Sequence, residues 1–192
     1  MAILLACRSL GEGWVNLVNI ANYTMDIISH LLVGRALAEL GNYSPSQITA
    51  ITLFAALPDA PQIPLYAYVG YKHKRFLDVP KNSDWLREHF RDKHPFWSAL
   101  WEVPHSLWFL LFVVTPVVIF FKLPLMAAVA YGSHLLADIF THKGEWAVKI
   151  FYPFKKKIHG YTNGWAWNIQ SMLALWVILL FIIWLLSKLH AH

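Results

Sequence analysis

The feature that most constrains the fold is a long apolar run near the C-terminus. No charged residue occurs from Trp165 to Ser187, and the centre of this run reads SMLALWVILLFIIWLLS. About 20 mostly apolar residues are enough to cross a bilayer as a helix. Trp165 and Trp167 are aromatic residues of the kind that gather at membrane interfaces. The segment 166–188 is therefore predicted to be a transmembrane helix.

The composition extends this conclusion to the whole chain. Of the 192 residues, 57% are hydrophobic and 14% charged, whereas soluble domains are roughly 45–50% apolar and about 25% charged. This length corresponds to about one domain, so residues 1–192 are expected to form a single integral membrane domain. The net charge of +5 is attributed to membrane-flanking loops, because no nucleic-acid-binding motif is recognisable. Cys7 is expected to be neither lipidated nor disulfide-bonded.

Further apolar segments predict more helices. Residues 96–121 form one, which Pro116 is expected to kink, and residues 123–141 form a second, with a turn at Lys122 and Pro124. Two shorter candidates, 27–40 and 46–57, precede them, and the second ends at a Pro-Asp-Ala-Pro sequence. The predicted fold class is all-α, a polytopic transmembrane helical bundle with about 4–5 membrane segments.

The polar loops predict the orientation. Two basic loops, at about 72–95 and 143–164, lie on one membrane side if 96–121 and 123–141 form a hairpin. The positive-inside rule places that side in the cytoplasm. We therefore expect an integral protein of the cytoplasmic (inner) membrane, with its N-terminus inside, its C-terminus outside, and the lipid bilayer as its partner.

Ionisable residues inside the predicted helices are the candidate functional residues, because a membrane makes them costly. The pairs Asp26/His30 and His134/Asp138 are four residues apart, and Glu102/His105 are three apart. Such spacing puts both members on one helix face. Counting 1.5 Å per residue from the expected cytoplasmic ends predicts a common depth for His30, Asp59, His105, His134 and Asp138.

Imidazole and carboxylate together suit zinc, manganese or iron, so these five residues are the predicted ligands of a divalent metal ion, with zinc favoured. A water held by such an ion is the usual nucleophile for hydrolysis. Glu102 and Asp26 are the candidate catalytic residues, either as a general base or as residues that orient ligands. At headgroup depth, a lipid-linked or phosphoester substrate is the expected class.

Other interpretations of the same residues stay open. A His–Asp pair four residues apart can be a structural ion pair or part of a proton relay, and polar pairs can simply hold helices together. The alternative function is thus a non-catalytic metal-binding or structural integral membrane protein. A histidine-dependent lipid phosphatase and a membrane desaturase fit less well, because the Pro-Ser-Gly-His motif of the first and the His boxes of the second are missing.

Several short motifs resemble a known family. SHLLVG at 29–34, LPDA at 57–60, HSL at 105–107, GSHLLADIFTHKG at 132–144 and YPF at 152–154 resemble the YdjM-type membrane-bound metal-dependent hydrolases. The resemblance implies that the same five residues form a metal site. The chain departs from the family pattern at Leu100 and Trp101, where a His-Arg pair is common. If that histidine is a ligand, this chain holds fewer metal ions or is inactive.

Overall fold

The computed structural model describes residues 27–73, 93–162 and 169–189. Its helices are Ile27–Ala38, α2 (Pro45–Ala56), η1 (Leu57–Gln62), α3 (Ile63–His73), α5 (Pro95–Glu102), α6 (Leu107–Phe109), η4 (Leu110–Val114), α7 (Thr115–Phe120), α8 (Met126–Thr141), η5 (Gly144–Trp146) and α9 (Ile169–Leu189). The described ranges contain no strand, only an isolated bridge between Val148 and Ile158. The predicted all-α class is confirmed. Cys7, Asp26 and most of the first basic loop lie outside the described residues.

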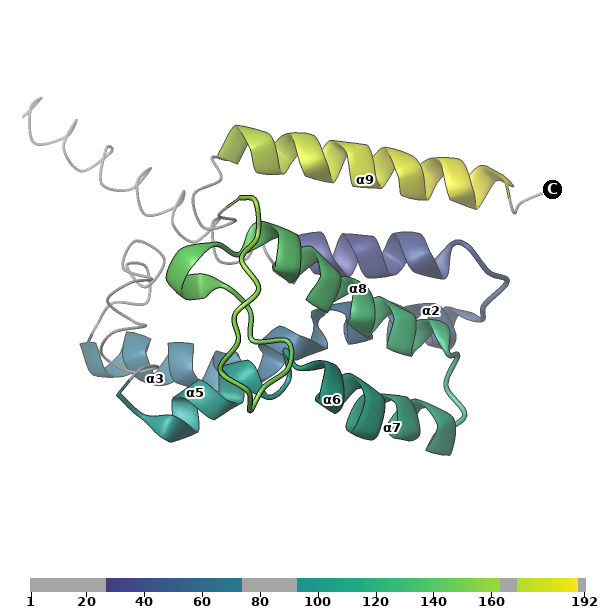
Figure 1. The fold of residues 1–192 in the computed structure, drawn as a ribbon. Helices are drawn as coiled ribbons and strands as arrows, with labels where there is room; N and C mark the ends of the chain where they lie inside the picture. The colour runs from purple at the N-terminus through teal and green to yellow at the C-terminus, as the bar shows by residue number, and fades with distance from the viewer. Residues whose placement is uncertain (1–26, 74–92, 163–168, 190–192) are drawn as a thin grey trace, which may run out of the picture.

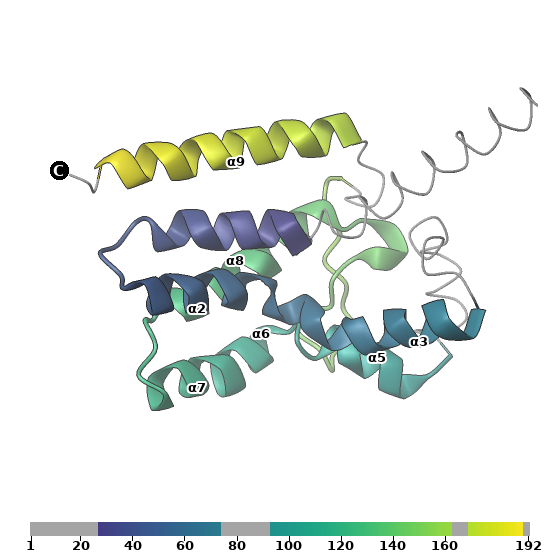
Figure 2. The same ribbon diagram turned by 180° about the vertical axis from the view of Figure 1, so that it is seen from behind.

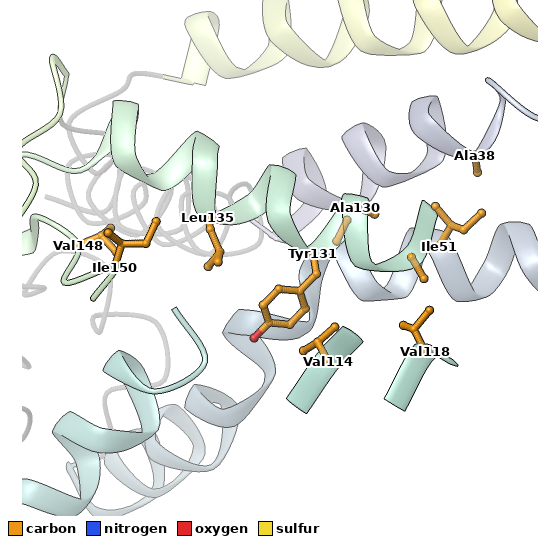
Figure 3. Packing of buried hydrophobic residues seen from close by; sticks show 11 residues of the cluster. Ala38, Ile51, Val114, Val118, Ala130, Tyr131, Leu135, Val148 and Ile150 are labelled. Carbon is orange, nitrogen blue, oxygen red and sulfur yellow. The ribbon is translucent and has the colours of Figure 1, made fainter. Parts of the chain in front are cut away.

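Helix α8 lies at the centre of the fold. It packs along α2 on one side, and α6 and α7 run antiparallel to it on another (Figures 1 and 2). The hydrophobic core lies between these helices, where Ile51, Val114, Val118 and Tyr131 are buried (Figure 3). The predicted hairpin is therefore present, with its turn at Lys122, whose φ is 54°.

Helix α9 lies on the outside, beside Ile27–Ala38 (Figures 1 and 2). The indole Nε1 of Trp176 donates to Ser29 Oγ over 3.0 Å and links the two helices. Within α9, Gln170–Leu189 is the helix long and apolar enough to cross a membrane. A second candidate is the bent pair Pro95–Glu102 and Leu107–Phe120. The described residues thus contain one candidate span, or two if the bent pair counts as one.

The main bend of the 96–121 segment is not at Pro116, where it was expected. The axes turn by 62° between Glu102 and Leu107, around Pro104, whose carbonyl accepts a hydrogen bond from Tyr131 of α8 at 2.7 Å. Pro116 instead sits in the first turn of α7. Its missing N–H is tolerated there, after a π-helical turn in which Thr115 Oγ1 donates to the Leu110 carbonyl.

The predicted break after the second apolar segment is present. Helix α2 starts with a capping box between Ser44 and Gln47 and with Pro45 in its first turn. It then tightens into the 3₁₀ turn η1, which contains Pro58 and Pro61. Proline lacks the N–H that an α-helix needs and clashes with the preceding turn. The turn places Asp59 just after the C-terminal end of α2.

Gly34 permits the close approach of Ile27–Ala38 to α2, and replacing it should destabilise the protein. An added Cβ would lie 2.6 Å from Ala55 Cβ and 3.0 Å from the Thr52 carbonyl oxygen. Overpacking of this kind costs about 1–3 kcal/mol. We expect Gly34→Ala to lower the thermal unfolding midpoint of the detergent-solubilised protein.

Gly132→Ala is the matched control, since its new Cβ would meet only Leu110 Cδ2, at 3.4 Å. Gly132 lies within α8, where alanine favours the helix. The thermal unfolding midpoint of Gly132→Ala should therefore stay the same or rise. An equal fall in both variants would contradict the packing explanation.

Candidate metal centre

The structure brings all five predicted ligands together. His30 comes from the helix Ile27–Ala38, Asp59 from η1, and His105 from the bend between α5 and α6. His134 and Asp138 lie one turn apart on α8. All are buried except Asp59, whose side chain is 13% exposed. We call these five residues the His/Asp cluster.

Four donor atoms of the cluster lie close to one another. His105 Nε2 lies 3.3 Å from His134 Nε2, 3.3 Å from Asp138 Oδ2 and 3.4 Å from Asp59 Oδ1. His134 Nε2 lies 3.3 Å from the same Asp138 oxygen and 3.8 Å from Asp59 Oδ1. Two ligand atoms bound about 2.1 Å from one tetrahedral ion are about 3.4 Å apart. These separations therefore suit a shared metal ion.

Backbone carbonyls fix which nitrogen of each histidine can bind a metal. His105 Nδ1–H donates to the Trp101 carbonyl at 2.7 Å, and His134 Nδ1–H donates to the Ala55 carbonyl at 2.8 Å. A carbonyl oxygen can only accept, so each Nδ1 carries a proton. In the neutral rings both Nε2 atoms then present lone pairs to each other and to two carboxylates. This is the orientation found when a second group positions a metal-ligating imidazole.

A cluster in which both histidines are protonated fits these separations less well. If His105 and His134 were both protonated, they would donate to Asp59 and Asp138. Such charge-assisted bonds are usually about 2.7–2.9 Å long, but the four N···O separations lie between 3.3 and 3.8 Å. The two Nε2–H groups would also point at each other over 3.3 Å. A cation between the donors removes both difficulties.

The second oxygen of Asp138 faces a different side of the cluster. Asp138 Oδ1 lies 3.6 Å from His30 Nε2 and 3.5 Å from His142 Nδ1, and it makes no hydrogen bond within the described part of the chain. The His30 ring stacks on the His134 ring, with centroids 3.6 Å apart. Two groups could thus hold metal, His30–His134–Asp138 and Asp59–His105–His134.

Several neighbours that sequence reasoning did not assign hold the cluster in place. Gln62 Nε2 donates to Asp59 Oδ1 at 3.0 Å, and the Trp101 ring stacks on His105 at 4.6 Å. His142 is buried against Asp138. The position of His142, four residues after Asp138, was the available signal for it. The sequence positions of Gln62 and Trp101 give no comparable indication of their role.

Glu102 is buried at the end of α5 and pairs with a lysine from the second basic loop. Lys149 Nζ donates to Glu102 Oε1 at 2.7 Å, while Glu102 Oε2 is buried without a hydrogen bond in the described chain. Lys149 therefore does not simply extend into solvent, because its loop folds back onto α5 and α6. The Ile150 carbonyl accepts from the Leu107 amide at 2.7 Å. The other candidate base, Asp26, lies outside the described residues.

Comparisons with models of protein families, with curated proteins and with solved structures found no match. The candidate metal centre is thus inferred from the geometry of the His/Asp cluster. That geometry shows buried histidine and aspartate groups that could hold a metal ion.

Proposed function

We propose that the protein is an integral membrane, metal-dependent hydrolase whose His/Asp cluster binds a divalent metal ion. The observation that carries this proposal is the pair of facing Nε2 atoms, 3.3 Å apart, each on a ring whose Nδ1 is held by a backbone carbonyl. Lone pairs and carboxylates gathered in a buried space repel one another unless a shared proton or a metal ion lies between them. The resemblance to the YdjM-type hydrolases, which implies the same five residues, adds to this argument.

The donor set favours zinc over manganese or iron. His105 and His134 supply imidazole nitrogens and Asp59 and Asp138 supply carboxylate oxygens, a mixture that zinc accepts in tetrahedral sites. A bound ion of this kind supplies catalysis by lowering the pKa of a water. The protein's own part is to fix the donors through Ala55, Trp101 and Gln62 and to exclude bulk water by burial.

A membrane setting for this site is supported by the outer faces of the helices. Ile119 and Phe120 on α7 are 62% and 79% exposed, and Val177 on α9 is 66% exposed. Apolar surface on this scale is typical of contact with lipid or another protein. We propose that about 4–5 segments lie in the cytoplasmic (inner) membrane and that the substrate is lipid-linked or a phosphoester. Glu102 or Asp26 is the proposed general base.

The proposed topology makes a direct prediction. If the two basic loops face the cytoplasm, a reporter inserted near Ser83 should behave as cytoplasmic, and one fused after His192 should behave as extracytoplasmic. Both positions lie outside the described residues. Paired phosphatase and fluorescent reporters measure this in cells. Both reporters on one side would overturn the proposed orientation.

The function is tested on the full chain purified in detergent, by metal analysis and turnover on a panel of phosphoesters and phospholipids. We expect stoichiometric zinc, hydrolysis of at least one class, loss of turnover on chelation, and recovery on adding zinc. Metal without turnover on any class would favour a non-catalytic metal-binding protein. Absence of metal would favour the structural interpretation, in which the polar pairs only hold helices together.

A further inference from the structure

We propose that the cluster is a two-metal centre in which Asp138 bridges the two ions. The inference rests on the proposed metal binding and goes beyond it in the number of ions and in the separate task given to His30. The first ion would be held by Asp59, His105, His134 and Asp138 Oδ2. The second would be held by His30 and Asp138 Oδ1, with solvent completing its coordination.

The carboxylate of Asp138 has the geometry of a bridge. Its Oδ2 lies 3.3 Å from both His105 Nε2 and His134 Nε2, whereas its Oδ1 lies 3.6 Å from His30 Nε2. Each oxygen is thus at a ligand-to-ligand distance from a different set of imidazoles. Two-metal hydrolytic sites hold their ions about 3.5–4 Å apart, a distance that one carboxylate spans by giving an oxygen to each.

The number of donors also exceeds what one ion uses. Three imidazole nitrogens, one Asp59 oxygen and two Asp138 oxygens converge, whereas a tetrahedral zinc site takes four donors and a catalytic one takes three from the protein. The donors fall into two groups, His30–His134–Asp138 and Asp59–His105–His134. His134 Nε2 can bind only one ion, and we assign it to the ion held by Asp59 and His105. His30 and the second Asp138 oxygen remain for the other ion.

Stacking on His134 keeps the His30 ring next to the ligands of the first ion without making His30 one of them. Its ring lies on that of His134, with centroids 3.6 Å apart and planes 24° apart. Nearly parallel rings direct their nitrogens to neighbouring points rather than to one point. His30 therefore serves an ion adjacent to the one that His134 binds.

The test is metal stoichiometry in detergent-purified full chain after equilibration with zinc and removal of loose metal. We expect two zinc ions per wild-type chain and one in His30→Phe, because phenylalanine keeps the ring stacked on His134 and removes the donor nitrogen. His159→Ala is the control, since His159 is exposed in the second basic loop, and it should keep two.

Each outcome separates the two proposals. One ion in the wild type would overturn the two-metal centre and leave the proposed hydrolase intact, whereas no bound metal would overturn both. Two ions in His30→Phe would overturn the assignment of His30. If His30→Phe does not fold, Mn²⁺-loaded wild type decides by electron paramagnetic resonance. Bridged ions give an exchange-coupled spectrum, and two equivalents with only an isolated-ion spectrum would overturn the bridge.

Discussion

His134→Ala is expected to yield protein that has lost the ion assigned to Asp59, His105, His134 and Asp138 after purification in detergent. His134 Nε2 lies within 3.8 Å of donor atoms from His105, Asp59 and Asp138, so its loss removes a ligand from the centre of the cluster. Losing a residue that only orients a ligand lowers metal affinity about 10–100-fold. The loss of metal affinity in His134→Ala should exceed that range. Competition with a chelator of known affinity measures it, and His105→Ala and Asp138→Ala should behave alike.

Two further variants calibrate this result. His142→Ala should fall within the 10–100-fold range, because His142 Nδ1 lies 3.5 Å from Asp138 Oδ1 and is expected to act through it. Lys155→Ala, at an exposed position of the second basic loop, should leave metal affinity unchanged. Lys149 is unsuitable as this control, since it pairs with buried Glu102. Full metal occupancy in His134→Ala would contradict the ligand assignment and favour polar pairs that only join helices.

The part of the site that lies on α8 was predictable because helical periodicity is local. His134 and Asp138, four residues apart, must share a face once the segment is a helix. Asp59 was placed by the Pro-Asp-Ala-Pro sequence, which ends α2 and becomes the turn η1. The meeting of these residues followed from counting depth in the predicted membrane, because chain segments held in one layer bring groups of equal depth together.

The bend in the 96–121 segment was not predictable in the same way. The segment turns around Pro104 rather than Pro116, because the Tyr131 hydroxyl on α8 reaches the Pro104 carbonyl and His105 faces the cluster from that bend. Proline marks where a helix can break, whereas tertiary contacts decide which proline is used. The number of membrane segments was not predictable in the same way either. Helix α2 has only 12 residues and α8 only 16, which correspond to helix lengths of about 18 and 24 Å.

The pair of Glu102 and Lys149 was invisible to sequence reasoning because 47 residues separate its members. It gives the second large expected effect. Lys149→Met should destabilise the protein by about 3 kcal/mol, the low end of the range for breaking a buried pair, because Glu102 is 2% exposed and would lose its cation. The measurement is thermal unfolding of the detergent-solubilised chain, with the metal content determined alongside.

Glu102→Gln separates the structural role of Glu102 from its proposed catalytic role. It should destabilise less than Lys149→Met, because the lysine it leaves behind has a side chain 23% exposed and reaches water. The double variant should recover most of the loss, since both members of the pair are then neutral. Metal content should stay at the wild-type level in all three variants, as Glu102 pairs with Lys149.

Turnover then decides whether Glu102 is the general base. A stable, metal-loaded Glu102→Gln protein without activity would support Glu102 in that role. Full activity in the same protein would leave that proposed role to Asp26.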